Sequence, residues 1–258
     1  MTEHSALHAI HLSAQRPIAV HSPDHLQPWG TKRDNSRNRR FNHKLYKLFG
    51  NRQIAVLDLG CSGGGFVRDC LDDGHLAIGL EGSDYSKRTQ RAEWATIPDF
   101  LFTCDVTAPF SLTINDAQMH FDAITSWELI EHIAEQDLQT VADNVGRHLA
   151  PGGIWIMSVS PNEDIIGGVR LHQSVFDRQW WLKTFSRLGW HNHQNVIDYF
   201  ATQFIRGPKF GAPGSFHLAL ARTKAAFPVP SLRFTERIFD SWNGSKWQRL
   251  LQRIVNGQ

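Results

Sequence analysis

The stretch "IAVLDLGCSGGGF", residues 54–66, constrains the fold of this chain more than any other segment. A short apolar run with the length of a buried strand is followed at once by a glycine-rich turn and then by a helical pattern. Glycines at such a turn permit a positive φ and let backbone N–H groups approach a ligand. The order strand, glycine turn, helix therefore indicates an α/β protein with a ligand site at the turn.

The same alternation continues along the chain. We predict strands at 54–59, 76–80, 100–104, 121–127 and 154–160, with helices at about 65–74, 85–94 and 136–149 between them. Strands that alternate with helices favour a parallel sheet covered on both faces. After residue 160 the pattern loosens, and we predict a helix at 175–188, a strand near 191–199 and an antiparallel edge strand at 216–222.

Changes in pattern divide the chain into three predicted parts. Residues 1–30 contain several prolines and form an N-terminal arm without a long helix. Residues 31–224 form the main domain, which opens with an amphipathic helix at 31–49 whose basic face we interpret as solvated. Residues 225–258 form a C-terminal helical extension, with an apolar stripe at 247–255.

Composition excludes several classes of protein. With 41% hydrophobic and 20% charged residues in a chain of 258, a folded domain of substantial size is expected. The net charge of +2 means that nucleic acid, a possible but not favoured partner, would depend on the basic patch at 32–47. No apolar run approaches the roughly 20 residues that cross a bilayer. Three cysteines without metal-like spacing indicate a reducing compartment, so we expect a cytoplasmic protein with no membrane partner.

An acidic residue follows the glycine turn at the distance that a nucleoside site requires. Glu81 ends the second predicted strand, about twenty residues after the turn, where a carboxylate can accept both hydroxyls of a ribose. A nicotinamide dehydrogenase has the same glycines and the same acid. Two further acids argue against that class: Asp58, two residues before Gly60, and Asp105, after the third strand.

Together with "CDVT" at 104–107 and "FDAITSWELIEHI" at 121–133, the glycine turn resembles the class I S-adenosylmethionine-dependent methyltransferases. The resemblance runs from about residue 55 to 159. It implies a Rossmann-like α/β fold, a seven-stranded mostly parallel sheet with helices on both faces. It also implies S-adenosyl-L-methionine as the cofactor.

The same resemblance implies roles for single residues. Asp58 and Gly60 would line the methionine part of the cofactor, and Ser62, Gly63 and Gly64 would complete the loop. Glu81 would hold the ribose, Asp105 would hold the adenine amino group, and Val106 would cover the face of the adenine ring. Ser126 and Trp127 would form the floor near the sulfonium. Ser62 stands where the family has its middle glycine. Serine tolerates an unusual φ less well, so we expect a slightly shifted loop and a hydroxyl able to bond the cofactor.

The stretch "SWELIEHI", residues 126–133, supplies the candidates for chemistry. We take Glu128, His132 and the later His172 as catalytic candidates, with a histidine acting as base toward an acceptor hydroxyl. Two other interpretations stay open. Glu128, Glu131 and the two histidines resemble the metal set of the 2′-O-methyltransferases of small-RNA 3′ ends. Alternatively, Glu131 and His132 simply begin a helix.

We therefore predict S-adenosylmethionine-dependent methylation, with O-methylation of a small-molecule or glycan acceptor and no resident metal. Trp180 and Trp181 are candidates for acceptor contact, but adjacent residues of one helix cannot both face a site, so at least one belongs to the core. The alternatives are a metal-dependent RNA 2′-O-methyltransferase and a cofactor-binding protein without turnover.

Overall fold

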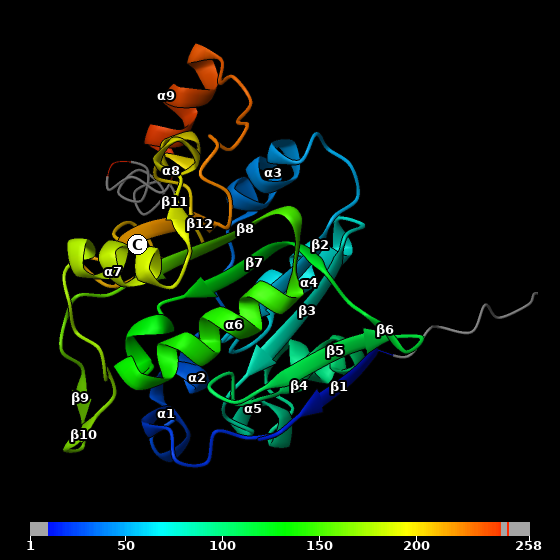
Figure 1. Cartoon of the computed structure of the whole chain (residues 1–258), viewed down its shortest axis with the longest axis vertical. Coiled ribbons are helices and arrows are strands. Elements are labelled where there is room, and N and C mark those ends of the chain that lie inside the picture. The colour runs from blue at the N-terminus through cyan, green and yellow to red at the C-terminus, as the bar shows by residue number, and fades with distance from the viewer. Residues whose placement is uncertain (1–9, 244–246, 248–258) are drawn as a thin grey trace, which may run out of the picture.

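A seven-stranded sheet forms the centre of the molecule (Figure 1). The structure is a computed structural model, and it describes residues 10–243 and 247. The strand order of the sheet is β11-β12-β8-β7-β2-β3-β4. The strands are β2 (Ala55–Leu59), β3 (Leu76–Glu81), β4 (Leu101–Thr103), β7 (Phe121–Trp127), β8 (Leu149–Val159), β11 (His191–Asn192) and β12 (Phe216–Ala221). The strands from β4 to β8 are parallel, and β12 runs antiparallel to both neighbours. The predicted fold class is confirmed.

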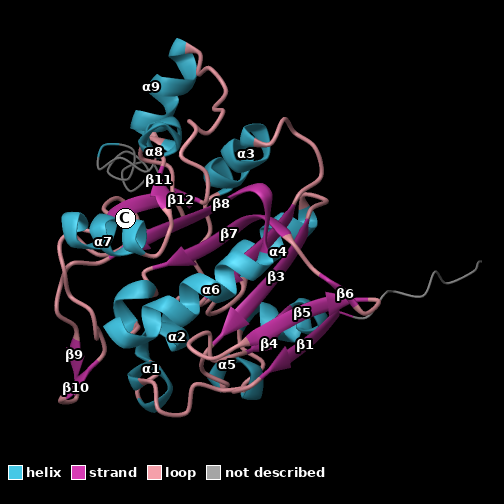
Figure 2. Cartoon of the chain, viewed as in Figure 1, coloured by secondary structure: helices cyan, strands magenta, loops and turns pink. Residues whose placement is uncertain are grey.

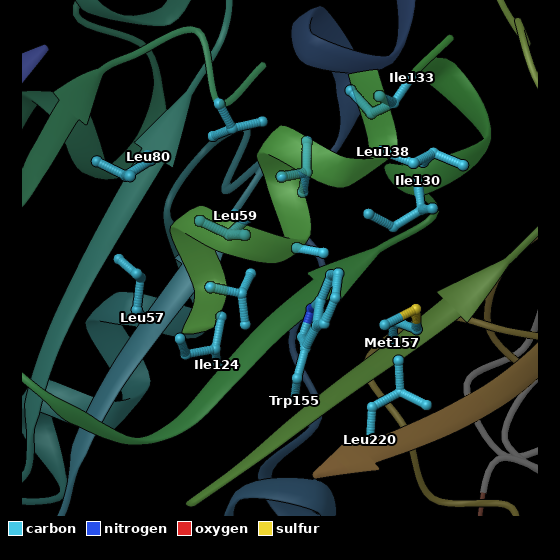
Figure 3. Close-up of a cluster of buried hydrophobic side chains, with 14 of the residues drawn as sticks. Leu57, Leu59, Leu80, Ile124, Ile130, Ile133, Leu138, Trp155, Met157 and Leu220 are labelled. Atoms are coloured by element: carbon cyan, nitrogen blue, oxygen red, sulfur yellow. The ribbon is translucent and has the colours of Figure 1, made fainter. Parts of the chain in front are cut away.

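Helices cover both faces of this sheet because successive residues of a strand point to opposite sides. Leu57 and Leu59 belong to one apolar core, shown in Figure 3, whereas Val56 between them belongs to the other. The first core is completed by α6 (Leu138–His148) and α7 (Arg178–Arg187), and the second by α3 (Arg39–Leu48), α4 (Gly65–Asp72) and α8 (Gln194–Phe200). Burial on both faces explains the near-continuous apolar runs of the strands.

Three predicted elements differ in the structure. The strand expected near 191–199 is wrong beyond β11, because Val196, Tyr199 and Phe200 have helical spacing and pack into the second core as part of α8. The antiparallel strand β12 is not the edge, since β11 lies outside it. The helix expected at 85–94 is broken into α5 (Tyr85–Arg88) and the 3-10 turn η1 (Ala92–Ala95), with positive φ at Gln90 between them.

The N-terminal arm is more ordered than its prolines suggest. Its first described residues form β1 (Ile10–Ala14), which pairs antiparallel with β5 (Phe110–Ile114), and β6 (Ala117–Gln118) completes this small sheet. Two short helices follow, α1 (Pro23–Leu26) and α2 (Trp29–Arg33). The pairing of β1 with β5 fixes the start of the arm to this small sheet.

The remaining elements are short. They are η2 (Pro98–Phe100), η3 (Ile130–His132), η4 (Glu135–Asp137), β9 (Ile165–Ile166), β10 (Val169–Arg170) and α9 (Phe234–Trp242). In α7, Trp181 is fully buried in the first core, and the half-buried Trp180 stacks on Phe176. One of the two tryptophans is therefore core, as expected. Apart from Trp247, the stripe predicted at 247–255 lies outside the described residues.

The helix expected at 31–49 is split, and its basic face is solvated only in part, since Arg39 is exposed whereas Lys44 is buried. Asn38 caps α3 by accepting hydrogen bonds from the N–H groups of Arg40 and Phe41. Within α3, Lys44 is 1% exposed and pairs with Asp240 of α9. Burial lowers the pKa of Lys44, against the opposing effect of Asp240. A charge removed from water needs such a partner, so these cations tie α3 to its neighbours. Nowhere in 10–243 or at 247 is there a helix long and apolar enough to cross a membrane.

Candidate active site

A cavity of about 500 Å³ lies at the carboxyl ends of the central parallel strands. Figure 2 shows β3 and β7 pointing toward the side of the molecule that carries α1 and α2. The cavity is lined by the glycine turn, by the ends of β3 and β7, by the segment after β4, and by the arm from Arg16 to Asp34. Ligands of open α/β sheets bind at this edge because the chain leaves each strand there.

The glycine turn after β2 has the backbone geometry that its residues suggest. Gly60 and Gly64 have φ of 73° and 83°, and Ser62 adopts a φ of 48° despite its side chain. The Ser62 hydroxyl donates to the backbone oxygen of Asp34 at 2.9 Å and accepts from Arg91 at 3.0 Å. The hydroxyl expected to bond the cofactor is therefore engaged with the protein.

Glu81 lies at the end of β3 and lines the cavity, although only 7% of it is exposed. Its carboxylate accepts hydrogen bonds from the backbone N–H groups of Ser62, at 2.7 Å, and Ser83, at 3.2 Å. Burial raises its pKa, and these two hydrogen bonds oppose the rise. A carboxylate has about four acceptor positions, so Glu81 keeps capacity for the hydroxyls of a ligand.

Asp105 and Val106 follow β4 and also line the cavity. The Asp105 carboxylate accepts from the N–H and the hydroxyl of Thr107, at 2.9 and 2.6 Å, and lies 3.2 Å from the guanidinium of Arg16. Arg16 belongs to the N-terminal arm, and sequence reasoning gave it no role.

Four residues of the predicted cofactor set do not line the cavity: Asp58, Gly63, Gly64 and Ser126. Asp58 is buried beneath the turn and accepts from the Thr125 hydroxyl at 2.7 Å, and burial raises its pKa to about 8. Ser126 accepts from the indole of Trp155 in the core. The side chains of Asp58 and Ser126 therefore pack behind the residues that line the cavity.

Trp127, Glu128, His132 and His172 line the same cavity, so the structure brings the catalytic candidates together. The two histidine rings meet edge to face, with centroids 4.5 Å apart. His132 lies in η3, directly after β7, and His172 lies in the loop after β10.

Glu128 is held in an ion-pair network. It adopts a φ of 48°, and its carboxylate accepts from Arg206 Nε at 2.7 Å, the N–H of Ala212 at 2.7 Å and the hydroxyl of Ser215 at 2.9 Å. Arg206 also donates to Asp34 at 2.7 Å. These contacts tie Glu128 to Arg206, to Ala212 and to Ser215 at the edge of the cavity.

Glu131 is buried, although it belongs to the lining of the same cavity. Its Oε1 accepts from the N–H of Ser160 at 2.7 Å, and burial raises its pKa to about 7. It does not begin a long helix, since α6 starts at Leu138. Across the part of the chain that the structure describes, no three His, Cys, Asp or Glu side chains are grouped to hold a metal ion. Among the described residues, Glu128, Glu131, His132 and His172 are therefore not grouped as the metal-dependent interpretation requires.

A partner from the arm raises the pKa of His132 and favours its charged form. Its Nδ1 lies 2.8 Å from Asp24 in α1. Burial disfavours the charge, but Asp24, with help from Glu131 and Asp164, outweighs burial and raises the pKa to about 9. Sequence reasoning missed Asp24, because nothing local connects it to His132.

The pKa of His172 is shifted in the opposite direction, below its ordinary value. Its Nδ1 lies 2.5 Å from the backbone oxygen of Asn162. Burial lowers its pKa first, and the neighbouring His132 cation lowers it further. A carbonyl oxygen can only accept, so Nδ1 carries the proton and Nε2 of neutral His172 keeps a free lone pair.

Comparison with known proteins identifies the class. Residues 33–207 match the family model described as a methyltransferase domain. That match covers more than half of the chain, which therefore belongs to this methyltransferase family. The chain is an S-adenosylmethionine-dependent methyltransferase. A search of curated proteins found no match.

One solved structure with a TM-score above 0.5 supports the fold, and two others score below 0.5. A 1,6-didemethyltoxoflavin N1-methyltransferase of Burkholderia thailandensis, solved with S-adenosylhomocysteine, superposes with a TM-score of 0.53 at 17% identity over 76% of this chain and 83% of its own. An amino pentose methyltransferase from Micromonospora echinaspora gives a TM-score of 0.49 at 12% identity, covering 77% and 96%. The magnesium protoporphyrin IX methyltransferase of Synechocystis gives 0.47 at 14% identity, covering 72% and 82%.

The residues present fit S-adenosylmethionine. The cavity brings the glycine turn together with Glu81, whose buried carboxylate suits ribose hydroxyls, and with Asp105 and Val106, which border the place expected for the adenine. Trp127 lines the same cavity.

Replacing Glu81 with alanine removes the acceptor proposed for the ribose. We expect Glu81→Ala to weaken S-adenosylhomocysteine binding by about 10- to 100-fold, since a hydrogen bond to a charged group contributes roughly 1.5–3 kcal/mol. Isothermal titration calorimetry measures this directly, with Asp72→Ala, an exposed acid on α4, as the control. Unchanged affinity in Glu81→Ala, or tighter binding of NAD by the wild type, would contradict the assignment.

Proposed function

We propose that this methyltransferase transfers a methyl group to a hydroxyl oxygen of a small-molecule or sugar-type acceptor, with His172 as the general base. The observation that carries the proposal is the hydrogen bond from Nδ1 of the cavity-lining His172 to the Asn162 carbonyl, which leaves Nε2 unprotonated. The cofactor supplies an electrophilic methyl group. A hydroxyl is a weak nucleophile until its proton is removed, and a neutral imidazole suits that task near neutral pH.

His132 complements His172 by contributing positive charge. With Asp24 at 2.8 Å it remains an imidazolium, edge to face with the His172 ring. A fixed cation lowers the free energy of an acceptor oxygen that gains negative charge. The same cation keeps His172 neutral, because a second positive charge at this distance is unfavourable. We assign His172 to proton removal and His132 to charge stabilisation.

The cavity supports a small acceptor rather than RNA. Its volume of about 500 Å³ lies within the range of small-molecule sites. The basic stretch that RNA would require is largely engaged within the protein: Lys44 is buried, Arg37 pairs with Asp69 at 2.7 Å, and Lys47 pairs with Glu236 at 3.0 Å. These contacts leave few cations of α3 for phosphates.

The acceptor class is tested by transfer of label from the cofactor to pooled phenols, glycans and RNAs, with and without a chelator. We expect labelled product from a hydroxyl-bearing small molecule or glycan, at a rate that the chelator does not change. Transfer to RNA that stops on addition of chelator would replace this proposal with the metal-dependent alternative, and a methylated amine as the product would contradict O-methylation.

Substitution of the proposed base should abolish most turnover. We expect His172→Gln to lower kcat by about 10²- to 10⁴-fold, the usual contribution of a general base, while S-adenosylhomocysteine affinity stays near wild type. His191→Gln, in β11 and outside the cavity, serves as the matched control. A His172→Gln enzyme with wild-type kcat would show that the acceptor needs no base from His172.

Asp24→Asn removes the carboxylate that keeps His132 charged. The pKa of folded His132, about 9, is above its ordinary value of 6.5. The ion pair therefore stabilises the fold fully below pH 6.5, and this contribution is lost as pH rises through about 9. In the variant we expect the free energy of unfolding to fall by about 1.5–3 kcal/mol below pH 6.5 and hardly at all above pH 9. Urea titrations across this pH range measure the difference.

The same variant should shift the pH dependence of catalysis. Without a cationic neighbour the pKa of His172 rises, so the acidic limb of kcat/KM moves to higher pH. Asp143→Asn, an exposed acid on α6, should change neither profile. An acidic limb that stays in place in Asp24→Asn would argue against coupling between the two histidines.

A further inference from the structure

Helix α9 (Phe234–Trp242) is fixed to the molecule along one side only. Its two acids face α3, where Glu236 pairs with Lys47 at 3.0 Å and Asp240 pairs with Arg40 at 2.6 Å and with the buried Lys44. The Asp240 side chain is 1% exposed. Figure 1 shows α9 beside α8, at the end of the molecule far from α1 and α2.

The opposite side of α9 presents large apolar side chains to solvent. Phe234, Ile238 and Trp242 follow one another at intervals of four residues, so they form a stripe along the helix. They are 76%, 54% and 42% exposed, and Phe239 beside them is 49% exposed. Exposed apolar side chains gathered on one helix mark an interaction surface, because their contact with water is unfavourable.

The exposed charged side chains beside this stripe are cationic. Glu236 and Asp240 pair with α3, and Glu236 also lies 3.5 Å from Arg233, so the exposed charged residues of α9 and its N-cap are Arg233 and Arg237. The sequence after Asp240 contains no acidic residue. Trp and Phe beside exposed Arg are the composition of helices that lie in the interface of an anionic bilayer.

We propose that the exposed stripe of α9, formed by Phe234, Ile238 and Trp242, docks this enzyme onto the surface of an anionic phospholipid bilayer. The apolar side chains enter the headgroup region, and Arg233 and Arg237 face lipid phosphates. A second copy of the chain is a poorer occupant, since a two-fold contact would place this cationic surface against itself. The helix lies on the bilayer and does not span it. This departs from the expectation of no membrane partner.

The test is co-sedimentation of the full chain with vesicles of phosphatidylcholine alone and of phosphatidylcholine with phosphatidylserine. We expect binding to the anionic vesicles that falls with added salt, and little binding to the neutral ones. Ile238→Ser should weaken the partition coefficient at least about tenfold, because the side chain no longer buries apolar surface. Arg237→Gln should reduce the preference for anionic over neutral vesicles.

Ile165→Ser is the matched control, since Ile165 in β9 is 61% exposed and lies outside α9. Circular dichroism establishes that each variant is folded. The proposal is overturned by absence of sedimentation, by equal binding to both vesicles, or by loss of binding in Ile165→Ser to the same extent as in Ile238→Ser. It is also overturned if the wild type self-associates without lipid and Ile238→Ser makes it monomeric.

Discussion

The ion-pair chain from Asp34 through Arg206 to Glu128 is the constraint on which the site depends. It joins the C-cap of α2, the loop after α8 and the residue after β7, with Arg206 27% exposed. Charges that lose water require partners, so these three segments cannot separate without leaving a carboxylate or a guanidinium unpaired. All three residues line the cavity, so their contacts hold one part of its wall together.

The sheet was predictable because its signals are local. The strand β7 matches its predicted range of 121–127, and the glycine turn after β2 takes the positive φ values that its residues permit. The pairing of β1 with β5 was not predictable, since "IHLSA" alternates weakly and its partner lies about a hundred residues away. Helix α8 was mistaken for a strand because seven residues are too few to separate the two periods.

The sequence predicted the motif residues of the site but not the partners that set their charge. Glu81 and Asp105 belong to motifs whose spacing fixes their place at the ends of neighbouring strands, and both line the cavity. The partners that set the charge state of the histidines were not visible: Asp24 reaches His132 through tertiary packing, and Asn162 reaches His172 through a backbone carbonyl. A sequence shows residue types, whereas a pKa depends on neighbours that only the fold brings together.

The serine in the glycine turn has a consequence for how ligands enter and leave. Glycine at position 62 would adopt the φ of 48° at no cost, but it would offer no hydroxyl to the backbone oxygens of Asp34 and Thr31. With serine, the cofactor turn is bonded to the segment from Thr31 to Asp34, and Arg91 reinforces the contact by donating to both. Any ligand exchange that moves this segment away from the turn must therefore break these hydrogen bonds.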